Sequence, residues 1–287
     1  MKTLYESILG DIDTTLDSGI NTIKNLIKDF LSENYGNANL CKISSKPNKD
    51  GKYIVNSEYA VSIKSTDCTS LTNEYFIFGT VKGNFNCSFC KNLTSLEGAP
   101  KEVEGDFNCI HCYSLISLKG APQKVGGDFK CHTCLNLKTF EGAPQKVGGS
   151  FNCEWCESLI NLNSSPEEVG KNFHCNYCDS LKSLEGAPQK VGGHFECAAC
   201  RELQSLKGAP KEVEGRFFCS YCDSLKSLEG SPQIVGRTFN CSYCPNLTSL
   251  KGAPKKVGDS FRCSSCKGKF QESDVRKYCK KVATIVI

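Results

Sequence analysis

Apolar and polar positions along this chain repeat with a fixed period of 22 residues. The triplet Phe-x-Cys recurs nine times without insertion, from Phe85 to Phe261. Eight of the nine copies read F-x-C-x-x-C-x-x-L-x-x-L/F, and most continue through G-A-P to x-x-V-x-G. Residues two apart lie on the same face of a strand, and Gly-Ala-Pro and Gly-Gly are typical of turns. One unit cannot bury its own apolar face, so we expect stacked units that share a continuous core.

This pattern predicts a repeat/solenoid fold, mainly β, in which nine 22-residue coils and one degenerate coil form a parallel ladder. At about 4.8 Å per coil, nine coils would make a ladder about 40 Å long. Subtracting 22 from Phe85, Cys87, Cys90 and Leu93 places the degenerate coil at Ile63, Ser65, Cys68 and Leu71. We therefore divide the chain into an N-terminal helix and hairpin cap (1–62), the solenoid (63–266) and a C-terminal helix and strand cap (267–287).

The N-terminal cap is expected to start with an amphipathic helix. Apolar residues at helical spacing predict a helix over residues 18–35, with Ser18 as its N-cap and Gly36 as its stop. This helix either seals the first coil or binds a partner. Alternating segments at Lys52–Val55 and Tyr59–Ile63, with a turn over 48–51, predict a small hairpin. The preceding residues 4–16 fit either a short helix or a detachable motif.

The C-terminal cap is expected to cover the last coil. Residues 271–281 are typical of a helix, with Ser273 as a candidate N-cap, and residues 283–287 (ATIVI) are typical of a strand. An uncovered edge of the ladder would otherwise invite pairing with another chain.

Composition and charge exclude several classes of protein. The 35 Lys and Arg residues nearly balance the 31 Asp and Glu residues, for a net charge of +4. A dedicated nucleic-acid-binding protein usually carries a stronger basic excess. No apolar run is long enough to cross a membrane. The first residues, MKTLYESILG, lack a signal-peptide pattern, so we expect a cytoplasmic protein with reduced thiols.

The repeat resembles known sequence families. The run V-x-x-x-F-x-C-x-x-C-x-x-L-x-x-L resembles the leucine-rich-repeat core, with two gaps each one residue longer. The resemblance implies that the first cysteine is an inward core residue and that the second bonds the turning backbone. Over nearly its whole length, the chain also resembles uncharacterised tailed-phage proteins, through segments 2–9, 93–107 and 263–270. That resemblance implies a viral origin, and hence the host cytoplasm, but no established activity.

Stacking would arrange the cysteines of the C-x-x-C pairs in two columns. Buried core thiols are one interpretation, because cysteine behaves as a small hydrophobe. Zinc or iron–sulfur sites are a second, because neighbouring pairs have a zinc-site spacing and thiolates suit both. Disulfides within the pairs are a third. The candidate metal ligands are Cys87, Cys90, Cys109, Cys112, Cys131, Cys134, Cys153, Cys156, Cys175, Cys178, Cys197, Cys200, Cys219, Cys222, Cys241, Cys244, Cys263 and Cys266, with Cys279 recruited from the cap helix.

Aromatic residues are enriched in the column that directly precedes the second cysteine. The column contains Phe89, His111, Trp155, Tyr177, Tyr221 and Tyr243, interrupted by Thr133, Ala199 and Ser265. Aromatic side chains with polar tips are favoured anchors at protein interfaces. Three interpretations stay open: a packing stripe along the ridge, a surface that binds a protein partner, and a platform for nucleobases, although the last lacks a basic groove.

No catalytic residues are expected. The four histidines fall in different columns, and neither paired carboxylates nor a Ser/His/Asp arrangement is apparent. Nine near-equal C-x-x-C copies offer no privileged redox pair. We therefore expect a non-enzymatic binding or scaffold protein that needs no cofactor and recognises a protein partner along its repeats. The alternatives are a metalloprotein with a row of zinc or iron–sulfur sites, for electron transfer or metal storage, and a component of the virion.

Overall fold

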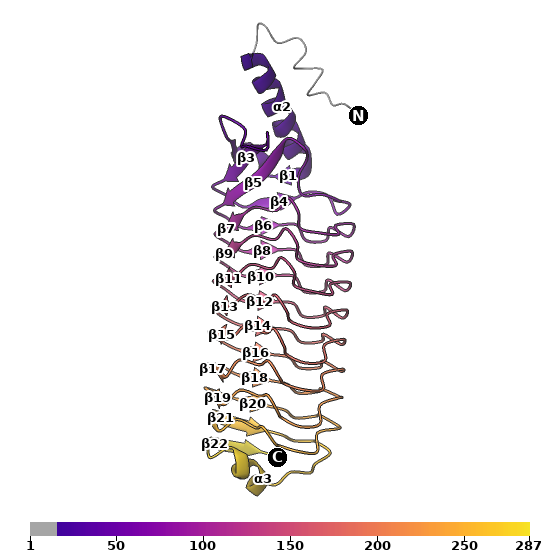
Figure 1. Ribbon diagram of the computed structural model, residues 1–287, viewed down its shortest axis with the longest axis vertical. Helices are drawn as coiled ribbons and strands as arrows, with labels where there is room; N and C mark the ends of the chain where they lie inside the picture. Colours follow the sequence, from indigo (N-terminus) through magenta and orange to yellow (C-terminus); the bar gives the residue numbers. More distant parts are fainter. Residues whose placement is uncertain (1–15) are drawn as a thin grey trace.

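The chain forms a slim parallel β-solenoid, as predicted (Figure 1). The computed structural model describes residues 16–287, so the expectation for residues 4–15 lies outside the described residues. Successive coils stack along one axis, with a helix at each end of the stack. No helix in the described part of the chain is long and apolar enough to cross a membrane.

The Phe-x-Cys segments form the first of two parallel ladders. Each Phe pairs with the Phe 22 residues away, as Phe129 does with Phe107 and Phe151. This ladder contains β4 (Val61–Ile63), β6 (Phe85–Asn86), β8 (Phe107–Asn108), β10 (Phe129–Lys130), β12 (Phe151–Asn152), β14 (Phe173–His174), β16 (Phe195–Glu196), β18 (Phe217–Phe218), β20 (Phe239–Asn240) and β21 (Lys256–Arg262).

The valine of each repeat forms a second ladder, which the sequence analysis did not predict. The valine sits at the end of a two-residue strand and pairs with its counterpart in the next coil, so each coil has two strands rather than one. The strands β7 (Glu102–Val103), β9 (Lys124–Val125), β11 (Lys146–Val147), β13 (Glu168–Val169) and β15 (Lys190–Val191) pair in sequence. The strands β17 (Glu212–Val213) and β19 (Ile234–Val235) continue the same column and pair with each other, but in the described residues no pairing joins β17 to β15. The long strand β21 joins both ladders at the C-terminal end.

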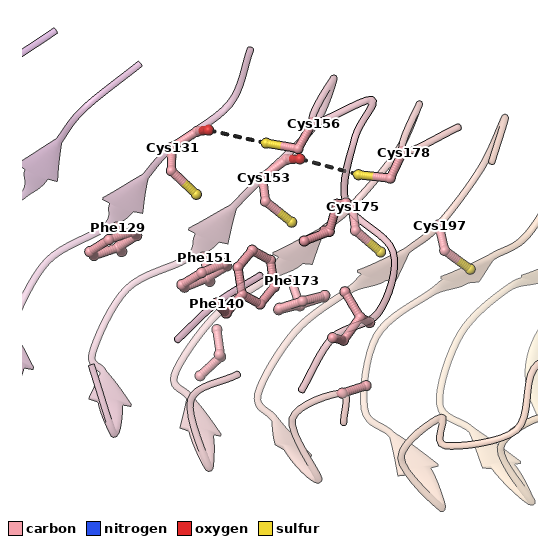
Figure 2. Packing of buried hydrophobic residues seen from close by; sticks show 14 of the residues in the cluster. Phe129, Cys131, Phe140, Phe151, Cys153, Cys156, Phe173, Cys175, Cys178 and Cys197 are labelled. Atoms are coloured by element: carbon pink, nitrogen blue, oxygen red, sulfur yellow. Dashed lines mark hydrogen bonds between the residues drawn. The ribbon is translucent and has the colours of Figure 1, made fainter. Parts of the chain in front are cut away.

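The core consists of columns of identical side chains. The rings of consecutive ladder phenylalanines lie 5.0 to 5.6 Å apart between centroids, from Phe85 to Phe261. Figure 2 shows Phe129, Phe151 and Phe173 in one file beside the sulfur column. The valines, both cysteine columns and both leucine columns are also buried between the ladders. Register is thus set by the apolar pattern, because a slip of one residue would expose it.

The glycine of Gly-Ala-Pro is required by backbone geometry. Gly120 has a φ of 88°, a left-handed conformation that glycine adopts without steric cost. A Cβ added at Gly120 would lie 2.4 Å from the backbone nitrogen of Glu97 in the preceding coil. Because glycine has no Cβ, this turn can lie directly on the turn of the preceding coil. Ser164 takes this position in one coil, with a φ of 66°.

The N-terminal cap combines a helix with a small antiparallel unit. The helix α2 (Leu16–Asn34) continues directly into β1 (Tyr35–Gly36), which pairs antiparallel with β4. The helix confirms the prediction over 18–35, but Ser18 lies inside it rather than at its N-cap. Ile27 and Leu31 are buried, so α2 covers the first coils. The short helix η1 (Ala38–Leu40) follows.

The predicted hairpin has different partners from those expected. The turn over 48–51 joins β2 (Cys41–Ile43) to β3 (Tyr53–Ser57) in an antiparallel pair. The predicted segment Tyr59–Ile63 contributes β4 to the first ladder instead. The strand β3 also pairs in parallel with β5 (Phe76–Val81), so this hairpin extends the second ladder.

The strand of the degenerate coil is separated from its partner in the next coil by more than the predicted 22 residues. Val61, and not Ile63, pairs with Phe85, which is an offset of 24 residues. After the strand the 22-residue spacing returns, because Leu71 is buried like Leu93 and the Cys90 thiol donates to the Ser65 carbonyl, 3.8 Å away. Two extra residues are therefore accommodated between the strand and Ser65.

The C-terminal cap closes the last coil. The helix α3 (Glu272–Tyr278) is shorter than predicted, and its N-cap is Gln271, which shares a capping box with Asp274. Ser273 lies inside α3, so the prediction that it forms the cap is wrong. The strand β22 (Lys281–Val286) pairs in parallel with β21 and covers the edge, as expected for the terminal strand.

Charged side chains on the outside alternate in sign from coil to coil. In the column before the turn glycine, Glu97 pairs with Lys119 at 3.2 Å, and Glu185 with Lys207 at 2.7 Å. These pairs are exposed, so each contributes little to stability. Alternation instead avoids the repulsion of like charges directly opposite each other on neighbouring coils.

We expect Phe173→Ala to lower the free energy of unfolding by about 3–5 kcal/mol, because it removes a buried ring and leaves a cavity between two stacked rings. Urea denaturation followed by circular dichroism measures this. The control Ile160→Ala, at a side chain that is 56% exposed, should change stability by less than about 0.5 kcal/mol. Equal effects of the two changes would contradict the stacked core.

Candidate functional site

A left-handed residue forms the corner of every regular coil. Cysteines three apart, such as Cys109 and Cys112, would face opposite sides of a continuous strand. The residue between them, His111, has a φ of 56°, which turns the chain so that both thiols point inward. The same position has positive φ in all nine copies, namely Phe89, His111, Thr133, Trp155, Tyr177, Ala199, Tyr221, Tyr243 and Ser265.

The aromatic members of this column form three stacked pairs on the surface. The ring centroids lie 4.7 Å apart in Phe89–His111, 4.0 Å in Trp155–Tyr177 and 4.7 Å in Tyr221–Tyr243. The five members other than His111 are 41% to 53% exposed. We call these six residues the aromatic stripe. The structure brings all of them to one ridge, and a small residue follows every second ring, so the stripe repeats every three coils.

The residues at the corner are unusual for their backbone conformation. A left-handed conformation costs about 1–2 kcal/mol for a residue with a Cβ, and glycine or asparagine normally takes such positions. None of the nine corners has either residue. An aromatic pair contributes about 0.5–1.5 kcal/mol beyond its burial, which does not offset two left-handed residues. Stability alone therefore does not account for the aromatic stripe.

The two cysteine columns are buried and hydrogen-bonded. All 21 cysteines are free thiols, so the disulfide interpretation finds no support. From Cys112 onward, each second-column thiol donates to the carbonyl oxygen of a first-column cysteine one coil earlier, as Cys156 does to Cys131 and Cys178 to Cys153, both at 3.3 Å (Figure 2). The same bond recurs for Cys112, Cys134, Cys200, Cys222, Cys244 and Cys266. The role expected for the second cysteine, bonding the turning backbone, is thus present.

Burial holds the thiols in their neutral form. It raises the pKa of first-column thiols such as Cys109, Cys175 and Cys197 well above the ordinary value. Cys279 is buried in the C-terminal cap, where its thiol faces the carbonyl of Lys281. Neutral, hydrogen-bonded thiols favour the interpretation as core residues.

One thiol at the N-terminal end differs from the rest. A hydrogen bond from the neighbouring Cys90 thiol lowers the pKa of Cys68 to about 7, although partial burial opposes this shift. Cys68, which belongs to the degenerate coil, is only partly buried.

A different set of side chains converges as metal ligands would. Among residues 16–287, the one such group of His, Cys, Asp or Glu is Glu154, His174 and Glu196, whose ligand atoms lie within 4.8 Å of one another. No cysteine belongs to it. His174 Nδ1 lies 3.0 Å from Glu196 Oε2, and the Asn176 amide donates to Glu154 at 2.6 Å and to Glu196 at 3.1 Å. We call these three ligand residues the central cluster.

His174 and Glu196 each stabilise the charged form of the other. Burial lowers the pKa of His174, but its hydrogen bond to Glu196 and the charges of Glu196, Glu154 and Asp128 together outweigh this and raise it. The hydrogen bond from His174 lowers the pKa of Glu196 in turn. The Glu196 carboxylate is thus available in ionised form at neutral pH.

The sequence analysis missed the central cluster, since it found no paired carboxylates. The three residues lie in two different columns of three consecutive coils, so no linear motif joins them. A signal was nevertheless present. The position between Phe and Cys is Asn in four of the nine copies, and His174 and Glu196 are consecutive departures from it. The three-coil period of the aromatic stripe was likewise readable in the sequence.

We expect Ala199→Gly to stabilise the protein by about 0.5–1 kcal/mol, because glycine tolerates the left-handed φ of 56°. The same change at Ala209, which has no positive φ, should destabilise it by a similar amount. Thermal unfolding of the two variants measures the sign. If Ala199→Gly destabilises as Ala209→Gly does, the corner conformation is not strained.

We expect iodoacetamide to modify Cys68 first in the native protein. Its pKa of about 7 provides thiolate at neutral pH, and its reactivity should fall as pH drops below 7. The buried ladder thiols should react only after unfolding, when all 21 become countable by mass spectrometry. Ladder thiols that react as fast as Cys68 in the native protein would contradict the neutral, closed core.

Comparisons with known proteins add no function. No family model, no curated protein and no solved structure matches the chain. The resemblance to tailed-phage proteins therefore stays a prediction. What the chain does has to be argued from the aromatic stripe, the cysteine columns and the central cluster.

Proposed function

We propose that this protein is a non-catalytic scaffold that recognises a protein partner through the aromatic stripe. The observation that carries the proposal is the exposure of three stacked ring pairs at left-handed backbone positions. Aromatic side chains dominate the energetics of protein interfaces, and they lose little conformational entropy when they bind.

The ladder holds the rings of the aromatic stripe in place before a partner binds. The backbone N–H of Trp155 donates to the Asn176 carbonyl at 3.0 Å, and that of Tyr177 to the Ala198 carbonyl at 2.9 Å. Stacking further restricts each ring. A surface ordered in advance avoids part of the entropy cost of association. Seven coil steps separate Phe89 from Tyr243, so the stripe is roughly 34 Å long, enough for an interface of standard size.

Other partners are less well supported. The net charge of +4 is small for a protein that binds nucleic acid, and the stacked faces of the rings are already occupied by one another. A row of cysteine-bound metal sites needs converging thiolates, whereas the thiols of the ladder donate to carbonyl groups. We further propose that the protein is phage-encoded and acts in the host cytoplasm, which rests on the sequence resemblance alone.

The variant Trp155→Ala/Tyr177→Ala/Tyr221→Ala tests the stripe. Loss of such anchors typically costs 2 kcal/mol or more, so affinity for the partner should fall at least about 30-fold. Proteins captured from host lysate by wild type and by the variant are compared by quantitative mass spectrometry, and the affinity of a captured protein is then measured. The control Ile116→Ala/Ile160→Ala removes two side chains that are equally exposed but lie outside the stripe.

Trp155 is the only tryptophan and serves as an intrinsic probe of the same surface. Its side chain is 45% exposed, so partner binding should shift its fluorescence to the blue and protect it from acrylamide. A partner that binds the triple variant with unchanged affinity, or that leaves Trp155 fully quenchable, would overturn the proposal.

A further inference from the structure

The central cluster lies on rigid elements in the middle of the array. His174 and Glu196 end the strands β14 and β16, and Glu154 follows β12 by two residues. The His174 and Glu196 side chains are 20% and 19% exposed, which leaves the cluster reachable from solvent while it is largely covered. Ligands held on strands keep their geometry better than ligands on free loops.

The cluster carries an excess of negative charge that no side chain neutralises. In residues 16–287, neither Glu154 nor Glu196 has a Lys or Arg within ion-pair distance. The neutral amide of Asn176 lies between the two carboxylates instead. Even with a protonated imidazole, the three ligand residues retain a net charge of −1. Like charges in a partly buried site repel one another, and a bound cation would relieve this.

The cluster also replaces a hydrogen bond that Asn side chains make elsewhere in the repeat, and the Ala198 N–H donates to Asn176 Oδ1 at 2.7 Å instead. Where Asn stands between Phe and Cys, its side chain accepts from the N–H two residues on, at 2.9 Å for Asn86 and 3.0 Å for Asn240. His174 and Glu196 replace this Asn in two consecutive coils and direct their side chains at each other. Lys130, Phe218 and Arg262 also depart from Asn in this column, but only His174 and Glu196 converge with a third ligand residue, Glu154.

We propose that Glu154, His174 and Glu196 bind one divalent transition-metal ion through two carboxylate oxygens and His174 Nδ1. An imidazole with two carboxylates is a set of nitrogen and oxygen ligands that suits manganese, iron and zinc. Binding displaces the proton shared by His174 Nδ1 and Glu196 to solvent, so the imidazole binds as the neutral ligand. Asn176 holds both carboxylates in place and acts as a positioning residue.

Titration with Mn²⁺ alone tests the site, because Mn²⁺ prefers oxygen and nitrogen ligands and avoids the 21 thiols. Electron paramagnetic resonance measures the free aqueous ion. Wild type should bind one Mn²⁺ per chain. His174→Asn, Glu196→Asn and Glu154→Ser each restore a residue that is common at that position of the repeat, so these variants should fold. Each should weaken binding at least tenfold, since loss of even an outer-shell partner typically costs 10–100-fold.

Glu157→Gln is the matched control, because it removes an exposed carboxylate from the same coil as Glu154 and should leave Mn²⁺ affinity unchanged. Circular dichroism verifies the fold of every variant. The absence of Mn²⁺ binding to wild type, or equal binding by wild type and the three variants, would overturn the proposal.

A spectrum of the wild-type protein with one equivalent of Co²⁺ provides a second test that needs no variant. Nitrogen and oxygen ligands should give only weak visible bands. An intense near-ultraviolet thiolate-to-metal charge-transfer band would instead assign the ion to the cysteine columns and overturn the proposal.

Discussion

The structure depends on one constraint, which is that each residue lies directly on its counterpart 22 residues away. Parallel pairing in register makes every position of the repeat a column along the molecule. Identical apolar side chains benefit from this, as the stacked phenylalanines show. Identical charges are penalised, and the alternation of Glu and Lys on the surface follows from the same rule.

Cysteine meets two requirements of so narrow a coil. The interior between the ladders admits only small residues beside Phe, Val and Leu, and the thiol fits as a small hydrophobe. The corner also turns a backbone carbonyl toward the core, where an unpaired acceptor would be costly. The second cysteine donates to this carbonyl, as Cys200 does to Cys175 at 3.1 Å, so one side chain fills space and completes the hydrogen bonding.

In such a uniform array, the departures from the repeat indicate where function resides. Columns of Phe, Val, Cys and Leu hardly vary, because each member supports its neighbours. The aromatic stripe and the central cluster vary. The first places bulky rings at left-handed corners, and the second replaces a hydrogen-bonding Asn by His174 and Glu196. The coils that contain Trp155 and Tyr177 also contain Glu154 and His174, so the aromatic stripe and the central cluster lie next to each other in the middle of the molecule.

The sequence by itself determined the solenoid, the period, the columns and the approximate caps, because a strict 22-residue repeat permits only one stacking register. It did not determine that Val61, and not Ile63, pairs with Phe85, because the position of the two extra residues is fixed only when the degenerate coil stacks on the next coil. Nor did it reveal the second ladder, whose strands are too short to show a period. The meeting of Glu154, His174 and Glu196 was decided by tertiary structure alone, because ligands in different columns and coils become neighbours only after stacking.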